Sequence, residues 1–227
     1  RVPCTAAEAQ RAPHAMNVTV FGATGQIGAL VVDDLLHAGH DVTAYVRNPD
    51  KLTTVDPRLV NVTGELSDGQ RIRQAIHGAD AVISALGPSL KRSAKGTPIT
   101  DGTKHIVAAM DAEEVGRFIG LATPSVPDER DEPTLKAKAL PIIAGFLFPN
   151  ALADIIGMTT AVTQSRLDWT IARITNPNNG TPKGTVRAGF LGRDKIGSAM
   201  SRADIAAFLV AQLTDDGFSR AAPAISN

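Results

Sequence analysis

The sequence predicts a doubly wound α/β fold, a parallel sheet with helices on both faces. Short apolar runs alternate with helical patterns along the chain, which is typical of such a sheet. The first apolar run leads into the turn Gly22-Ala-Thr-Gly-Gln-Ile-Gly28, and a helical pattern follows at once. The chain has 227 residues, of which 43% are hydrophobic, so one large domain is long enough to bury a core. Together these observations indicate a single-domain Rossmann-type fold.

The expected strands are short runs that end at turn residues, and the expected helices follow 3.6-residue spacing. We expect strands at Met16–Phe21, His40–Val46, Leu59–Thr63, Ala81–Leu86, Arg117–Ala122, Asp168–Ala172 and Ala224–Ser226. We expect helices at Ile27–Gly39, Ser67–Gly78, Ile99–Met110, Met158–Ser165 and Ala203–Leu213. Glycine is well placed to end the first two of these helices.

Composition excludes several classes of partner. Lys plus Arg and Asp plus Glu number 23 each, so no net charge attracts nucleic acid. The single Cys4 excludes an internal disulfide and a cysteine metal cluster, which fits a reducing cytoplasm. The five histidines include no i,i+4 pair, so a metal site has no support. We therefore expect a cytoplasmic protein without nucleic acid or metal.

The first fifteen residues stand apart from the folding pattern. Arg1–Ala15 holds no apolar run of signal-peptide length, and the pattern begins at Met16. We expect residues 1–15 to be a leader or an expression remnant outside the fold, and residues 16–227 to form the dinucleotide-binding domain.

The glycine-rich turn is typical of a phosphate site. Gly22 permits a tight turn, Gly25 lets a phosphate approach the backbone, and Gly28 lets the helix pack on the strand. The helix N-terminus adds N–H donors and a positive dipole end for a pyrophosphate. A glycine-rich turn that binds no ligand is the alternative, and the flanking strand and helix favour the dinucleotide site.

The end of the second strand predicts which dinucleotide binds. An NAD site has an acidic residue about 20 residues past the glycines. Here the strand ends at Arg47, and no carboxylate follows until Asp50. An arginine suits the 2′-phosphate of NADP(H) through charge-assisted hydrogen bonds, while a solvated surface arginine is the alternative. The sequence thus predicts NADP(H) rather than NAD(H).

Two further strand ends extend the expected cofactor track. We expect Glu65 and Leu66 to lie beside the adenine, although Glu65 could instead cap the helix that follows. The stretch Ser84-Ala-Leu-Gly87 is small enough for a cofactor to pass, although Gly87 could be an ordinary loop glycine.

The chain lacks the Tyr-x-x-x-Lys pair that many reductases of this fold use as a proton donor. Its only tyrosine is Tyr45, and Pro49 stands four residues later. Hydride transfer to a ketone leaves an alkoxide that needs a positioned acid, whereas a flavin or quinone delocalises the charge. The sequence therefore favours an NADPH-dependent reductase of a flat conjugated acceptor, with the chemistry supplied by the cofactor.

The stretch 135–158 is rich in apolar residues. Pro141, Pro149 and Asp154 interrupt it, so a membrane span is not expected. It fits an apolar wall for a flat substrate, a dimer surface or ordinary helix packing. We expect a monomer or a homodimer.

Seven motifs resemble those of the atypical short-chain dehydrogenase/reductases of the NmrA-like NAD(P)H-binding group. The resemblance is strongest to flavin reductases of the biliverdin reductase B type and to bacterial quinone reductase-like proteins. The motifs are Gly22-Ala-Thr-Gly-Gln-Ile-Gly28, Tyr45-Val-Arg-Asn-Pro49, Gly64-Glu-Leu-Ser-Asp68, Ala81-Val-Ile-Ser-Ala-Leu-Gly87, Asp101-Gly-Thr-Lys104, Leu167-Asp-Trp-Thr-Ile-Ala-Arg173 and Ser201-Arg-Ala-Asp-Ile-Ala206.

The resemblance implies a role for residues along the whole cofactor. The pyrophosphate would be surrounded by Thr24, Gly25, Gln26 and Ile27, and the 2′-phosphate would meet Arg47. The adenine would meet Glu65 and Leu66, and the ribose side would meet Ala85, Leu86 and Gly87. The nicotinamide would be bordered by Thr123, Arg173 and Ile174.

The chain also departs from the flavin reductases. Where they carry a serine after the threonine, this chain has Pro124, and Ser125 follows one residue later. Thr123 and Ser125 are therefore the candidates for orienting the nicotinamide or the substrate. Because these departures touch the catalytic positions, a non-catalytic NADP(H)-binding sensor or regulator, as some NmrA-like relatives are, is the alternative function.

Overall fold

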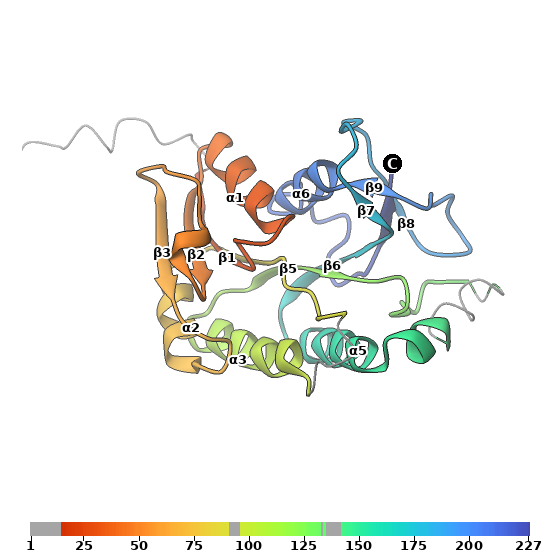
Figure 1. Ribbon diagram of the computed structural model, residues 1–227, viewed down its shortest axis with the longest axis horizontal. Coiled ribbons are helices and arrows are strands. Elements are labelled where there is room, and N and C mark those ends of the chain that lie inside the picture. Colours follow the sequence, from red (N-terminus) through yellow and green to blue (C-terminus); the bar gives the residue numbers. More distant parts are fainter. Residues whose placement is uncertain (1–14, 91–95, 133, 135–141) are drawn as a thin grey trace, which may run out of the picture.

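An eight-stranded sheet lies at the centre of the protein, with helices on both faces (Figure 1). The computed structural model describes residues 15–90, 96–132, 134 and 142–227. The sheet has the order β3-β2-β1-β4-β5-β6-β10-β8. Its strands are β1 (Asn17–Phe21), β2 (Asp41–Val46), β3 (Leu59–Thr63), β4 (Ala81–Ser84), β5 (Arg117–Ala122), β6 (Asp168–Ile174), β8 (Arg187–Gly189) and β10 (Ala224–Ser226). The predicted doubly wound α/β fold is confirmed.

The helices form one layer on each side of the sheet. They are α1 (Gly28–His37), α2 (Gly69–Ile76), α3 (Pro98–Ala112), α5 (Pro149–Thr163) and α6 (Arg202–Ala211). In Figure 1, α1 and α6 lie above the sheet, and α2, α3 and α5 lie below it. Each layer buries its own apolar core against the sheet. Adjacent strand residues such as Val20 and Phe21 enter opposite cores because strand side chains alternate.

The strand order reverses at β1, and this reversal determines where the loops after the neighbouring strands meet. β1 pairs in parallel with β2 on one side and with β4 on the other. Phe21 at the end of β1 is level with Tyr45 and with Ser84. The loops after these three strands therefore leave the sheet at the same edge, at the switch point where ligands bind in such folds.

The helix that was expected at Met158–Ser165 is α5, and it begins nine residues earlier, at Pro149. Proline suits the first turn of a helix, so it marks the start of α5 rather than a break. Asp154 does not interrupt the helix either. Its buried carboxylate accepts the backbone N–H groups of Ile99 and Thr100 at 3.2 and 2.7 Å, and so caps the start of α3.

The last part of the sheet differs from the prediction. The expected terminal strand is β10, parallel to β6, but β8 pairs antiparallel with it, so the sheet is not wholly parallel. A separate two-stranded sheet joins β7 (Pro177–Asn178) and β9 (Met200–Ser201). These strands have two or three residues, too few to show a period of two. The expected leader, residues 1–15, lies outside the described residues except for Ala15.

Candidate functional site

A groove of about 780 Å³ runs along the edge where β1, β2, β3 and β4 end. Its walls come from the loops after these strands and from the start of α3. Many of the residues that the sequence assigned to the cofactor line it: Gly22, Thr24, Gly25, Arg47, Glu65, Leu66, Ala85, Leu86 and Gly87. The structure thus brings these nine residues together on one continuous surface.

The turn after β1 requires its glycines. Gly22 has a φ of +78°, which favours glycine, and a Cβ there would lie 2.9 Å from the carbonyl carbon of Ala85. A Cβ on Gly28 would collide with the carbonyl oxygen of Gly22. The N–H of Gly25 donates to that same oxygen at 2.9 Å. The turn therefore packs tightly against both α1 and the loop after β4.

The start of α1 suits an anion. Ile27, at its N-cap, makes no side-chain capping bond, and no residue of the first turn, all of them described, is acidic. The first N–H groups of a helix lack intrahelical partners and carry the positive end of the dipole. The start of α1, which follows the groove residues Thr24 and Gly25 in the chain, therefore offers a phosphate both backbone donors and a favourable potential.

Two cations reach the groove from the segment that follows β2. Arg47 is exposed directly after the strand, and Lys51 lines the same groove. A short 3-10 helix, Pro49–Lys51, brings the lysine there, and the Asn48 side chain caps it by accepting the Asp50 N–H at 3.0 Å. Sequence reasoning missed Lys51. The Asn-Pro pair, a typical turn start, was the signal that could have found it.

The loop after β3 forms another part of the groove, through Gly64, Glu65, Leu66 and Ser67. Asp68, not Glu65, caps α2, since its side chain accepts the Arg71 N–H at 3.0 Å. The alternative that Glu65 caps this helix is therefore wrong. From α3, sequence reasoning missed Asp101, Gly102 and His105, which also line the groove. They face the β3 loop from a separate helix, so no local pattern connects them with it.

Tyr45 lines the same part of the groove, and its side chain is a neutral phenol. Burial, and then the nearby carboxylates of Asp68 and Glu65, raise its pKa to about 12. Its hydroxyl donates to the carbonyl oxygen of Glu65 at 2.8 Å. A phenol with so high a pKa holds its proton near pH 7, so Tyr45 is a structural donor here.

Some of the expected site residues are not among those that line the groove. Gln26, Ile27 and Gly28 were expected at the pyrophosphate, and Thr123, Ser125 and Ile174 at the nicotinamide or the substrate. Thr123 and Ser125 are half-buried in the loop after β5. Their roles stay predictions.

The expectation that Arg173 borders the nicotinamide is wrong for its side chain. Arg173 is 0% exposed, and its guanidinium donates to the Asp131 carboxylate at 2.5 and 2.7 Å and to the Val126 carbonyl at 3.1 Å. A charged group buried on folding needs such a partner, and Asp131 supplies it. The arginine therefore stabilises the loop after β5 from inside.

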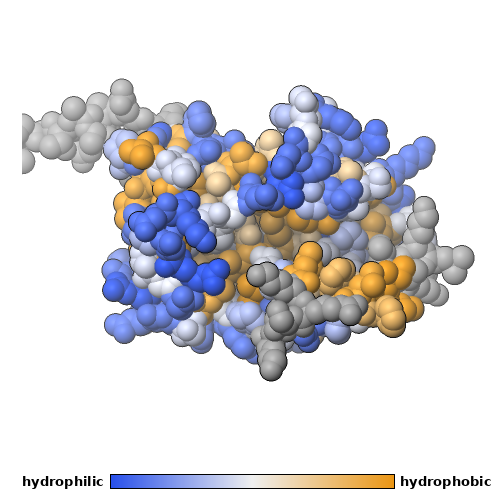
Figure 2. Space-filling view, viewed as in Figure 1, coloured by the Kyte–Doolittle hydropathy of each residue, from blue (hydrophilic) through white to orange (hydrophobic). Residues whose placement is uncertain are grey.

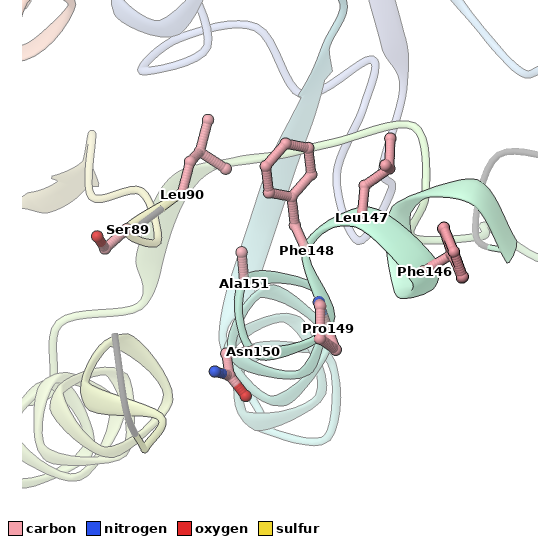
Figure 3. A pocket seen from close by; sticks show the side chains of 8 residues that line it. All are labelled: Ser89, Leu90, Phe146, Leu147, Phe148, Pro149, Asn150 and Ala151. Carbon is pink, nitrogen blue, oxygen red and sulfur yellow. The ribbon is translucent and has the colours of Figure 1, made fainter. Parts of the chain in front are cut away.

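Beyond the end of β4 the groove meets a second pocket of about 330 Å³, and Ser89 lines both. The side chains of this pocket are mainly apolar (Figure 3): Ser89, Leu90, Phe146, Leu147, Phe148, Pro149, Asn150 and Ala151. Leu90 is 65% exposed and Phe146 is 83% exposed. Figure 2 shows a concentration of hydrophobic side chains on this part of the surface. Residues 135–141 of the expected apolar wall lie outside the described residues.

A family model described as NAD(P)H-binding matches residues 22–216, from the glycine turn to beyond α6. The chain belongs to this NAD(P)H-binding family. The resemblance to the atypical short-chain dehydrogenase/reductases and the assignment of a nicotinamide dinucleotide cofactor are thereby confirmed.

Solved structures share the fold across the whole domain. A short-chain dehydrogenase/reductase from Veillonella parvula, crystallised with NADP, has a TM-score of 0.74 at 19% identity, covering 93% of this chain and 94% of that one. An anaerobillin reductase from Escherichia coli O157:H7 has a TM-score of 0.72 at 19% identity, covering 92% and 96%. At this identity the likeness shows the fold.

A curated relative matches a shorter stretch. A 3-beta-hydroxysteroid dehydrogenase from Mycolicibacterium neoaurum is 32% identical over 119 residues, which are 48% of this chain and 32% of the relative. The matched stretch spans 32% to 51% of the length of the first curated relatives.

Among the described residues, no helix has the length and apolarity to cross a membrane, and no cluster of three metal-ligating side chains occurs.

Proposed function

We propose that the protein is an NADPH-dependent reductase that transfers hydride to a flat conjugated acceptor such as a flavin or a quinone. One observation carries this proposal. The groove of an NAD(P)H-binding protein shares Ser89 with a neighbouring pocket whose walls include Leu90 and Phe148. An apolar pocket beside the cofactor is where a flat acceptor would lie against the reactive ring.

The cofactor preference rests on charge at the end of β2. Arg47 and Lys51 together offer two cations to a 2′-phosphate, and β2 does not end in a carboxylate that would bind the ribose hydroxyls of NAD. The structural neighbour crystallised with NADP supports the same choice. We therefore assign NADPH as the reductant.

The groove implies an order of contacts from one end to the other. Arg47 and Lys51 would hold the 2′-phosphate, and the Glu65–Leu66 loop would hold the adenine. The turn from Gly22 to Gly28 would bind the pyrophosphate, with Thr24, Gln26 and Ile27 around it. Ala85, Leu86 and Gly87 would follow the ribose, which directs the nicotinamide toward Ser89 and the apolar pocket. Thr123, Ser125 and Ile174 are proposed to border it from the loops after β5 and β6.

The protein's own part in this reaction is to bind NADPH and the acceptor and to orient one against the other. NADPH supplies the hydride, and the reduced flavin or hydroquinone takes its second hydrogen as a proton from water. Tyr45 keeps its proton near pH 7 and already donates to the Glu65 carbonyl, so it has no acid–base role. A reaction without a protein acid suits an acceptor that delocalises negative charge.

The test is a steady-state assay of NADPH oxidation with FMN, riboflavin and small quinones. Anaerobillin is included because a structural neighbour is described as an anaerobillin reductase. We expect turnover with at least one flat acceptor, and slower turnover for Phe148→Ser. Val55→Ser is the matched control, since Val55 is an exposed apolar residue outside the pocket. No oxidation above background, despite micromolar NADPH binding, would overturn the enzyme proposal in favour of a non-catalytic NADP(H)-binding sensor.

Compartment and assembly are part of the proposal. One cysteine in 227 residues suits the reducing cytoplasm. The exposed apolar surface at Phe146 suits either an acceptor wall in a monomer or contact in a homodimer.

A further inference from the structure

Two side chains from different elements hold consecutive carbonyl groups of the loop after β3. The Tyr45 hydroxyl, on β2, donates to the Glu65 oxygen at 2.8 Å. The His105 ring, on α3, bonds through Nδ1 to the Leu66 oxygen at 2.9 Å. Because a carbonyl oxygen can only accept, Nδ1 carries the proton of this bond. The two bonds fix the orientation of both peptide groups.

Glycines on either side of this loop leave it little room to shift. A Cβ on Gly64 would collide with the Tyr45 hydroxyl. A Cβ on Gly102 of α3 would lie 2.7 Å from the Cβ of Leu66. The loop is thus packed against the tyrosine on one side and against α3 on the other.

The tyrosine itself is anchored. Tyr45 is 4% exposed, and its ring lies 5.1 Å, centroid to centroid, from the ring of Phe21 on β1. His105 comes from α3, whose start is capped by the buried Asp154. The loop is therefore tied to the sheet through Tyr45 and to the helix layer through His105.

We propose that Tyr45 and His105 are positioning residues that fix the Glu65–Leu66 loop as the edge that recognises the amino group of adenine. Both residues and both loop residues line the groove. The inference rests on the proposed placement of the adenine at this loop.

The chemistry of the loop suits a hydrogen-bond donor on the ligand. Glu65 contributes a carboxylate, which accepts hydrogen bonds, and the adenine amino group donates them. A hypoxanthine ring has a carbonyl in place of that amino group. Discrimination between the two rings depends on how well the loop holds its position, because hydrogen bonds weaken steeply with distance and angle.

The experiment compares NADPH with its hypoxanthine analogue, reduced nicotinamide hypoxanthine dinucleotide phosphate. Each is titrated by fluorescence against the full chain and against Tyr45→Phe, His105→Leu and the double variant. The wild type is expected to prefer NADPH. Each single variant is expected to lose about three- to tenfold in NADPH affinity, as for one neutral hydrogen bond, and to lose little for the analogue.

Two controls separate positioning from general damage. His77→Leu changes an exposed histidine outside the groove and is expected to leave both affinities unchanged. Preference for NADPH over NADH is expected to persist in all variants, since Arg47 and Lys51 are untouched. If Tyr45→Phe fails to fold, His105→Leu alone tests the inference, because His105 is only half-buried.

An equal loss for NADPH and the analogue, or no loss for either, overturns the inference. Because the readout is binding, an absence of turnover with flavins and quinones contradicts the proposed function and leaves this inference standing. Wild type that binds both cofactors equally would show that the loop does not recognise the amino group.

Discussion

Arg173 and Asp131 form a two-point ion pair inside the protein, with nitrogen–oxygen distances of 2.5 and 2.7 Å. The arginine is the second-last residue of β6, and the aspartate lies in the segment that follows β5. Asp131 also accepts the backbone N–H of Leu191 at 2.8 Å. One carboxylate thus joins three segments that are distant in the sequence.

Asp131→Asn is expected to lower the free energy of unfolding by about 3–5 kcal/mol, because it leaves a buried guanidinium without its counter-charge. Urea unfolding followed by circular dichroism measures the change. Asp101→Asn is the control, since Asp101 pairs with Lys104 on the surface, with both side chains more than 60% exposed. Equal, small effects of the two substitutions would contradict the assigned role.

The same pair predicts a dependence of stability on pH. Burial alone would raise the pKa of Asp131, but hydrogen bonds from Arg173 and from backbone N–H groups outweigh it and hold the pKa below its ordinary value of 3.8. A lowered folded-state pKa adds stability above that ordinary value, and the stability is lost as pH falls through the folded-state pKa. Unfolding titrations between about pH 5 and pH 2 should therefore show a shallower decline for Asp131→Asn than for wild type. Parallel declines would exclude Asp131 as a contributor.

Arg47→Glu and Lys51→Glu are each expected to weaken NADPH binding by about 10- to 100-fold and NADH binding far less, because each removes a charged partner of the 2′-phosphate. Fluorescence titration with both cofactors measures the ratio. Arg71→Glu makes the same change of charge on α2, outside the groove, and should leave the ratio close to that of wild type. A similar loss for both cofactors would show that these cations do not select the phosphate.

Gly28→Ala is expected to lower both the Tm and the affinity for NADPH, since the added methyl group would collide with the Gly22 carbonyl and force the turn apart. Gly116→Ala is the matched control, because a Cβ there meets nothing within 4 Å. If Gly28→Ala binds NADPH as tightly as wild type, the turn from Gly22 to Gly28 is not part of the cofactor site.

The sequence was sufficient where the signal is local. The turn at Gly22 and the apolar runs of β1 to β6 follow from patterns within a few residues, and Arg47 follows from its place after β2. Tyr45 stays protonated, which agrees with the presence of Pro49, rather than a lysine, four residues later.

Other features depend on contacts between distant segments. Arg173 looks like a cofactor residue until Asp131, 42 positions away, is seen beside it. His105 contacts a loop 39 positions away. The pairing of β8 with β10 joins strands of three residues each, which carry no periodic signal.

The position of β10 has a consequence for the order of folding during synthesis. β10 lies between β6 and β8, although it follows both in the chain. The N–H groups of Ile171 and Arg173 donate to the carbonyls of Ala221 and Pro223. A nascent chain that has emerged only as far as residue 220 therefore exposes one open edge of β6, which is a template for pairing with other chains. The sheet closes only when residues 221–226 leave the ribosome, so this half is completed after β6 and β8 have both emerged.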